Sequence, residues 1–271
     1  MRPLAQAYWF SRRRQRWLPL RRIWGGSITA AELICYGPAS RPQDDVSTSG
    51  GAIDATMRPV FTQLTANAII EVVSDGADTR TVTILGRDTT GALVTTSIVL
   101  NGATAVDGAQ TYERILSVTL SATSATRTVT VRQGAAGATI ATVPPNETGF
   151  YALFISSFST TSPQVRYEKL FWKNTDASLT LTAATLTLTA DPSAVTQIGV
   201  AASVGDSGSV ANRLTAPGGI TFVGVGTAQN VPGGGNLAAG AAIGVWIQQS
   251  LAANNAPIRS TFTSQLAGNT T

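Results

Sequence analysis

The chain has 271 residues, no histidine and a single cysteine, Cys35, and only 13% of its residues are charged. One cysteine excludes an intrachain disulfide and a multi-cysteine zinc site, and the missing histidine removes the commonest metal ligand and proton carrier near neutral pH. No apolar run approaches the ~20 residues of a membrane-spanning helix. With 38 threonines and 26 glycines, the composition favours an all-β fold.

The formal charge of +4 is unevenly distributed along the chain. Residues 1–26 hold seven of the 19 basic residues and no acid, so the remainder has 19 − 7 = 12 bases against 15 acids. Arginine interrupts the apolar stretch that a secretory signal needs. We predict an extended basic N-terminal arm whose guanidinium and indole groups bind an acidic protein surface. The predicted anchor residues are Trp9, Phe10, Arg12, Arg13, Arg14, Arg16, Trp17, Arg21, Arg22 and Trp24.

Other interpretations of residues 1–26 stay open. The segment is alternatively a disordered basic tail, or the product of an upstream start codon without a function of its own. Nucleic-acid binding is a third alternative, because basic and aromatic residues interleave. We rank it below the protein anchor, because three exposed tryptophans in so short a tail are costly to a free protein.

Residues 27–58 are rich in Pro, Gly, Ser, Thr and Asp, which predicts a linker with one short strand at 31–36. Asp44 and Asp45 are adjacent acids within it. Such a pair in a polar loop is usually solvated, and we rank a metal site well below that interpretation.

Residues 59–143 predict a first β-sandwich domain, because alternating segments are separated by turn signals every 8–12 residues. Two of these segments flank Asp88-Thr89-Thr90-Gly91, which predicts a hairpin. The predicted strands are at 69–74, 79–87, 93–100, 114–121 and 126–133.

Pro144-Pro145-Asn146 interrupts the pattern, and we predict a second β-sandwich domain over residues 144–271. Its organising segment is 166–191, and within it leucine and alanine alternate with threonine over 179–190. The alternation changes phase after Ala183, which predicts a β-bulge or a strand that crosses between sheets. The whole chain is thus expected to be all-β, with two consecutive sandwiches of jelly-roll or immunoglobulin type behind the arm.

No catalytic site is predicted. Gly205-Asp206-Ser207-Gly208 resembles the nucleophile loop of a trypsin-type protease, but a triad needs a histidine base. A Ser–Lys dyad would have to use one of the two lysines, Lys169 and Lys173. A carboxylate pair for glycoside hydrolysis would draw on Glu147, Glu168 and Asp176, and no spacing brings these together. We expect no enzyme activity, no cofactor and no metal.

Several segments resemble virion structural proteins of tailed bacteriophages. They are ASRPQDDVSTSGGAID, RTVTILGRDTTGALVTTSIVLNGATAV, YEKLFWKNTDASLTLTAA, ANRLTAPGGITF and AIGVWIQQSLAANNAP. The resemblance covers about residues 28–271 and leaves out the arm. It implies no catalytic residues.

The resemblance and the arm together suggest a capsid cement or decoration protein. Such a protein would bind the major capsid protein or other virion proteins through its arm, as a homo-oligomer and most simply a trimer. Its location would be the virion, assembled in the bacterial cytoplasm, with no membrane contact. The alternative is a fibre, spike or collar component that binds a host receptor or glycan. A DNA-contacting protein inside the head ranks third.

Overall fold

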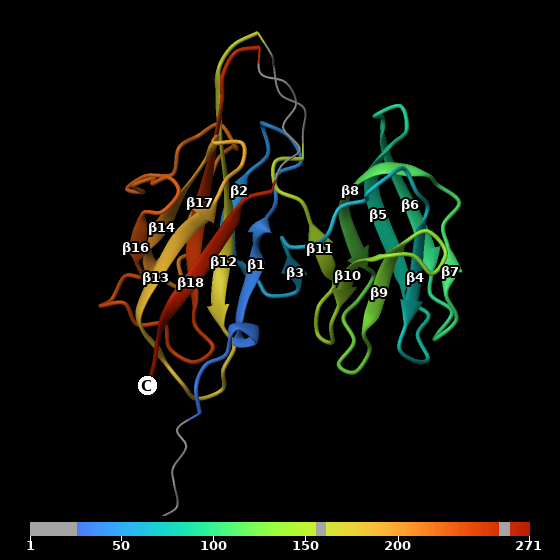
Figure 1. Ribbon diagram of the computed structural model, residues 1–271, viewed down its shortest axis with the longest axis horizontal. Helices are drawn as coiled ribbons and strands as arrows, with labels where there is room; N and C mark the ends of the chain where they lie inside the picture. Colours follow the sequence, from blue (N-terminus) through green and yellow to red (C-terminus); the bar gives the residue numbers. More distant parts are fainter. Residues whose placement is uncertain (1–25, 156–160, 255–260) are drawn as a thin grey trace, which may run out of the picture.

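The computed structural model describes residues 26–155, 161–254 and 261–271. Within these ranges the regular structure is one 3-10 turn, η1 (Ala30–Glu32), and the strands β1 to β18. The protein is all-β, as the abundance of threonine and glycine predicts. Its strands form four sheets, which lie in two groups side by side (Figure 1).

The first group consists of a six-stranded and a three-stranded sheet. The larger has the order β14 (Thr196–Val204), β17 (Ala242–Leu251), β12 (Gln164–Asn174), β1 (Leu33–Ser40), β2 (Ser49–Asp54) and β15 (Ser209–Val210). The smaller has the order β16 (Ala228–Asn230), β13 (Leu181–Ala190) and β18 (Thr263–Thr270). Apolar residues of both sheets form one core, including Leu170, Ile198, Val245, Leu186 and Leu266.

The second group has its own core. Its five-stranded sheet has the order β3 (Met57–Arg58), β11 (Gly149–Tyr151), β8 (Tyr112–Leu120), β5 (Thr81–Asp88) and β6 (Leu93–Val99). Its four-stranded sheet has the order β10 (Thr139–Val143), β9 (Val129–Gln133), β4 (Ile70–Ser74) and β7 (Val106–Asp107). The buried side chains between them include Ile84, Val118, Phe150, Val72 and Val131.

The strands predicted between residues 59 and 143 are confirmed, with ends shifted by a few residues. The predicted hairpin is confirmed as well, since β5 and β6 pair antiparallel with Arg87 opposite Leu93. Gly91 adopts a φ of 83° in its turn and donates its N–H to the Asp88 carbonyl oxygen at 2.9 Å. That left-handed conformation suits glycine because it has no Cβ.

Residues 27–58 differ from the predicted linker, because β1 and β2 are integral to the six-stranded sheet. β1 pairs antiparallel with β12, placing Leu33 opposite Asn174 and Tyr36 opposite Phe171. The pairing gives β12 a hydrogen-bonded neighbour on the side away from β17 and adds Leu33 to the core. The paired residues of β1 and β12 lie more than a hundred residues apart in sequence. The local composition of residues 27–58 therefore indicates the turns but not this strand pairing.

The five-stranded sheet likewise extends past the predicted boundary at residue 144. β11 lies beyond it and pairs with β8 and β3 of the five-stranded sheet. Between the two groups, Tyr36 donates its hydroxyl to Glu147 at 3.1 Å, and Arg58 Nε donates to the same carboxylate at 2.6 Å. This buried junction ties β1 to the segment before β11.

A β-bulge accounts for the change of phase in β13. The register with β18 shifts between Thr182 and Thr185, and Ala183 has a φ of 48°. Because of the extra residue, Leu181 and Leu186 are both buried in the same core despite their odd spacing. The bulge is held by a loop, since Ala184 N donates to the Gly235 carbonyl oxygen at 2.7 Å. Of the two predicted alternatives, the bulge is therefore the one that the structure has.

We predict that Ala183→Gly stabilises the protein by about 0.5–1 kcal/mol, because alanine is strained at positive φ. Ala190→Gly, at an exposed position of the same strand with ordinary φ, should instead lower stability by about 0.5–1 kcal/mol. Urea unfolding of the two variants checks this. A loss of stability in both would contradict the strain at Ala183.

Candidate functional site

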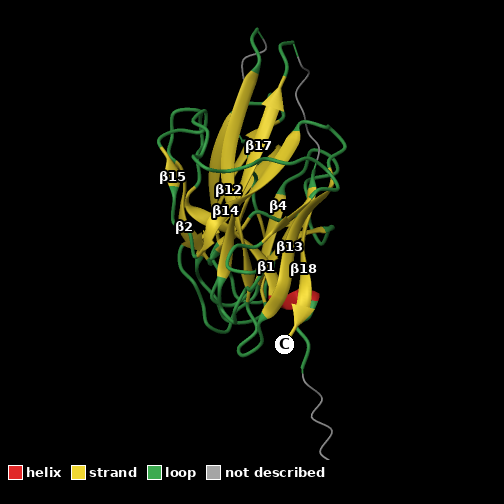
Figure 2. Ribbon diagram, turned by 90° about the vertical axis from the view of Figure 1, so that its left-hand side faces the viewer, coloured by secondary structure: helices red, strands yellow, loops and turns green. Residues whose placement is uncertain are grey.

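All ten predicted anchor residues of the arm lie in residues 1–25, outside the residues that the structure describes. The described chain begins at Gly26, next to the end of β18: Ile28 N donates to Thr270 Oγ1 at 3.1 Å. η1 follows at this end of the six-stranded sheet, and the C-terminus lies at the same end (Figures 1 and 2). The first described residues therefore lie at one end of this sheet.

Strand β12 carries an unusual amount of buried charge for a protein with so few charged residues. Arg166 and Lys169 are 0% exposed and Glu168 is 3% exposed. Side chains alternate between the faces of a strand, so Arg166 and Glu168 share one face and Lys169 lies on the other. A buried charge is costly unless it is paired and hydrogen-bonded.

On the first face, two arginines share one carboxylate from a distant loop. Asp45 accepts from Arg166 Nη2 at 2.7 Å, and from Arg213 through Nη2 at 2.7 Å and Nε at 3.1 Å. Arg213, which is also 0% exposed, donates through Nη1 to Glu168 Oε1 at 2.8 Å. The N–H of Phe154 donates to the same carboxylate at 2.9 Å. We call Asp45, Arg166, Glu168 and Arg213 the arginine clamp.

The two acids of the arginine clamp have opposite pKa shifts. Burial raises the pKa of Glu168 to about 7, although Arg213 and the Phe154 N–H act against this. Partial burial also acts on Asp45, but the hydrogen bonds from Arg166 and Arg213 lower its pKa overall. Asp45 therefore stays ionised near neutral pH, whereas Glu168 titrates there.

On the second face, Lys169 is enclosed by loops. Its ammonium donates to Asp206 Oδ2 at 2.5 Å and to the carbonyl oxygens of Gly208 (2.9 Å) and Gly51 (3.1 Å). It also lies 4.8 Å from the centre of the Phe171 ring. Burial lowers the pKa of Lys169, and Asp206 opposes this. Its hydrogen bonds hold the glycine-rich turn 205–208 against the sheet and also connect β12 with β2.

The described residues do not assemble the catalytic arrangements considered from the sequence. Ser207 is exposed and is not among the described hydrogen-bond partners of Lys169. Glu147 pairs with Arg58, Glu168 pairs with Arg213, and Asp176 accepts from the N–H groups of its own turn, so the three acids have separate partners. In the described ranges no group of three or more acidic or cysteine side chains is placed to hold a metal ion.

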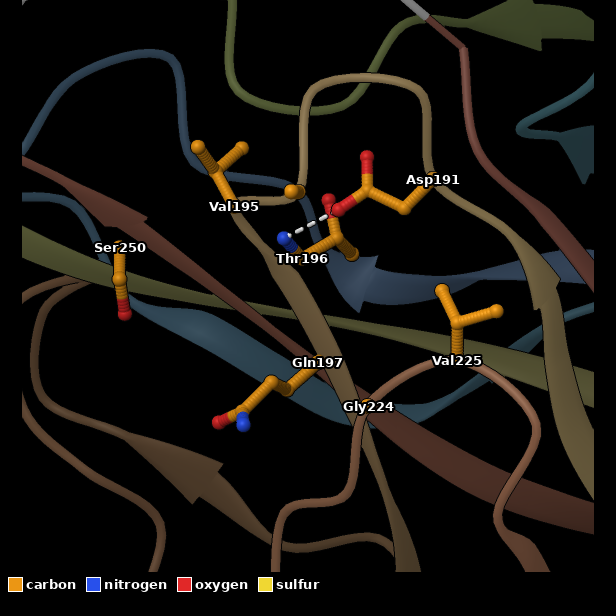
Figure 3. Close-up of a pocket in the computed structure, with 8 residues that line it drawn as sticks. Asp191, Val195, Thr196, Gln197, Gly224, Val225 and Ser250 are labelled. Atoms are coloured by element: carbon orange, nitrogen blue, oxygen red, sulfur yellow. Dashed lines mark hydrogen bonds between the residues drawn. The ribbon is translucent and has the colours of Figure 1, made fainter.

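An open groove of about 400 Å³ lies where β14 and the loop before it meet the end of β17 (Figure 3). Its lining is mostly small or polar, and includes Asp191, Gln197, Val225 and Ser250. The carboxylate of Asp191 is engaged within its own loop, accepting from Thr196 N at 2.6 Å and Ser193 Oγ at 2.7 Å. The groove offers hydrogen-bonding groups but no acid–base pair.

Two exposed apolar residues are sequence neighbours of the arginine clamp. Val46 is 79% exposed and Leu214 is 46% exposed, and each directly follows a clamp residue, Asp45 or Arg213. Loop 41–48 follows β1, whereas η1 precedes it, so the clamped loop and the first described residues lie at opposite ends of β1 (Figure 1). The arginine clamp therefore joins two loops to β12, and each loop has an exposed apolar side chain next to its clamp residue.

Comparison of the chain with protein-family models, curated proteins and solved structures gives no match in any of the three. In the part of the chain that is described, no helix is long and apolar enough to cross a membrane.

The arginine clamp is not predicted from the sequence. Asp45 is expected there to be a solvated acid, and no pattern in the sequence analysis points to Arg166 or Arg213. One signal was available, because Arg166, Glu168 and Lys169 interrupt a segment that is otherwise apolar and aromatic. Charges on both faces of a buried strand indicate buried ion pairs.

We predict that Asp45→Ala lowers the unfolding free energy by about 2 kcal/mol, because it leaves two buried guanidinium groups without their shared carboxylate. Asp44→Ala is the matched control, because Asp44 is exposed and, among the described residues, its hydrogen bonds come from Val46 and Ser47 of its own turn. Its loss should be much smaller. Equal losses in denaturant unfolding would show that the clamp contributes nothing specific.

We predict a pH dependence of stability from Glu168. Its pKa in the folded state, about 7, lies above the ordinary 4.5, so between these values the folded protein binds more protons than the unfolded chain. The unfolding free energy should therefore fall as pH rises from about 4.5 to about 7. Glu168→Gln, which keeps the hydrogen-bond acceptor, should remove this slope, whereas the exposed Asp75→Asn should leave it. No histidine titrates in this window, so an unchanged slope in Glu168→Gln would contradict the assignment.

Proposed function

We propose that this protein is a structural component of a tailed-phage virion, and most simply a capsid cement or decoration protein. In this proposal the arm binds the assembled coat while two β-sandwich domains, one for each hydrophobic core, lie outside it. The proposal rests first on the composition of residues 1–26, where arginine and tryptophan are concentrated without any acid. Tryptophan and arginine are the residues that most often dominate the energy of protein interfaces.

The body of the protein is consistent with a load-bearing role. Its buried charges are used in joining loops to sheets, as in the arginine clamp, and not in a reaction centre. The first described residues lie at one end of the six-stranded sheet, and the exposed Val46 and Leu214 lie beside the clamp. A protein that binds the closed shell and not free coat subunits stabilises the shell by mass action.

A fibre, spike or collar component is the second candidate. The groove beside Asp191 favours it, because a shallow groove with hydroxyl, amide and carboxylate groups suits the hydroxyls of a glycan. This role would place recognition in the body and make the arm an attachment to the particle. DNA contact through the arm is a third candidate, and it predicts a steep loss of affinity with salt.

We predict that deletion of residues 1–25 abolishes binding to capsids that lack the protein, while the circular dichroism spectrum of the sheets is unchanged. Co-sedimentation and occupancy in electron micrographs measure the binding. Normal occupancy by the truncated protein would refute the anchor. Binding of host cells or glycans by the truncated protein would favour the fibre or spike candidate.

A matched pair of arm variants separates specific anchoring from charge alone. Arg12→Lys, Arg13→Lys and Arg14→Lys together keep the charge but lose the bidentate guanidinium geometry. Trp9→Ala, Trp17→Ala and Trp24→Ala together remove the indoles and keep every arginine. The proposed anchor requires both sets to weaken binding at least tenfold. Full binding by the lysine variant would indicate an electrostatic contact such as nucleic acid.

A further inference from the structure

The free edge of β6 lacks the protection that sheet edges usually have. β6 is the last strand of the five-stranded sheet and reads LVTTSIV, with no charge, proline or glycine. Its register with β5 runs from Leu93 to Val99 without a bulge. Natural proteins normally blunt an exposed edge with charges, proline, bulges or a very short strand, because an open edge can pair with another chain.

Every other strand at a sheet edge in the described ranges has such a device. The edge strands β3, β7, β15 and β16 are only two or three residues long. The edge strands β10, β14 and β18 each contain a register shift. β6 is thus the long and regular edge of this part of the chain.

The hydrogen-bonding pattern shows which backbone groups of β6 face outward. Leu100 N donates to the Arg80 carbonyl oxygen at 3.0 Å, so the even-numbered residues of this segment are hydrogen-bonded to β5. Successive residues of a strand direct their N–H and C=O groups to opposite sides. The residues whose backbone groups face the free edge are therefore Leu93, Thr95, Ser97 and Val99.

The sequence of β6 is complementary to itself in the antiparallel direction. Around a two-fold axis at Thr96, Leu93 opposes Val99 and Thr95 opposes Ser97 of a second copy. Apolar residues then face apolar ones, and hydroxyls face hydroxyls. In this register edge-facing residues oppose edge-facing residues, so their N–H and C=O groups can form roughly eight hydrogen bonds between the copies.

Exposure and charge agree with this pairing. Leu93 and Val99, near the two ends of the strand, are each 59% exposed. On β5, Arg87 lies beside Leu93 and Thr81 lies beside Val99. The antiparallel arrangement brings the Arg87 end of one copy to the Thr81 end of the other, where the neighbouring Arg80 is paired with Asp78.

We propose that β6 pairs with β6 of a second copy of this chain, antiparallel about Thr96, and joins the two five-stranded sheets into one. The contact is separate from the proposed arm anchor, and it predicts dimers of the free protein rather than the trimers expected from the family resemblance. A single strand pair buries a small interface, so we expect a dissociation constant of about 1–100 μM.

The full-length protein tests the proposal in sedimentation equilibrium at about 1–300 μM. We expect a mass that approaches twice 28.0 kDa as concentration rises. The double variant Thr95→Lys/Ser97→Lys places lysine opposite lysine across the axis and should weaken the dimer at least tenfold. The matched variant Thr95→Lys/Ser97→Glu places lysine opposite glutamate and should dimerise. A monomeric or trimeric wild type would overturn the proposal, as would equal dimerisation of the two variants.

Disulfide trapping tests the register independently. In this pairing Thr96 opposes itself in a non-hydrogen-bonded pair, where Cα atoms are ~4.5 Å apart and suited to a disulfide. Thr96→Cys should therefore form a covalent dimer under mild oxidation. Val94→Cys places its thiol opposite Ile98 of the second copy, so this variant should not form a covalent dimer. The wild-type protein is the control for disulfides formed by Cys35. Two outcomes would overturn the register: covalent dimers of Val94→Cys that form as efficiently as those of Thr96→Cys, or no covalent dimer of either variant.

Discussion

The burial of three charged side chains on β12 constrains much of the larger sheet group. Arg166, Glu168 and Lys169 have almost no exposure, and each would be costly without a partner. Their partners come from loops far away in the chain: Asp45, Arg213 and Asp206. The same strand is therefore the centre of the sheet and the attachment point of its loops, because an ion pair of this kind is stable only when every member is in place.

This use of charge distinguishes the body from a typical reaction centre. Catalytic sites generally keep a titratable group accessible to a substrate, whereas Lys169 and Arg213 are enclosed and hydrogen-bonded to the protein itself. The exposed parts of the sheets are lined largely by threonine and small residues. Such a surface is suited to contacts with neighbouring proteins, which is the role that we propose for this chain.

Two kinds of contact are proposed, and they depend on different interactions: side-chain contacts of the arm and backbone hydrogen bonds of β6. The arm concentrates guanidinium and indole groups, whose bidentate and stacking geometry suits an acidic protein surface. The edge of β6 offers backbone groups in a regular register, which suits another strand. In an assembly, the first would attach the protein to its neighbours in the particle, and the second would join two copies of the protein.

The sequence by itself determined that the protein is all-β, that a hairpin lies at Asp88–Gly91 and that the alternation changes phase at Ala183, because period-two alternation and turn residues are local signals. The structure decided that this change of phase is a bulge and not a crossing between sheets. It did not determine that β1 pairs with β12, or that β11, which follows the boundary expected at residue 144, pairs with β8, which precedes that boundary. It also did not show that Asp45 reaches two buried arginines. Only the tertiary structure decided these strand pairings and ion pairs, because they depend on which distant segments meet in space. Side-chain periodicity indicates that a segment is a strand, but it does not indicate which strand or side chain that segment will contact.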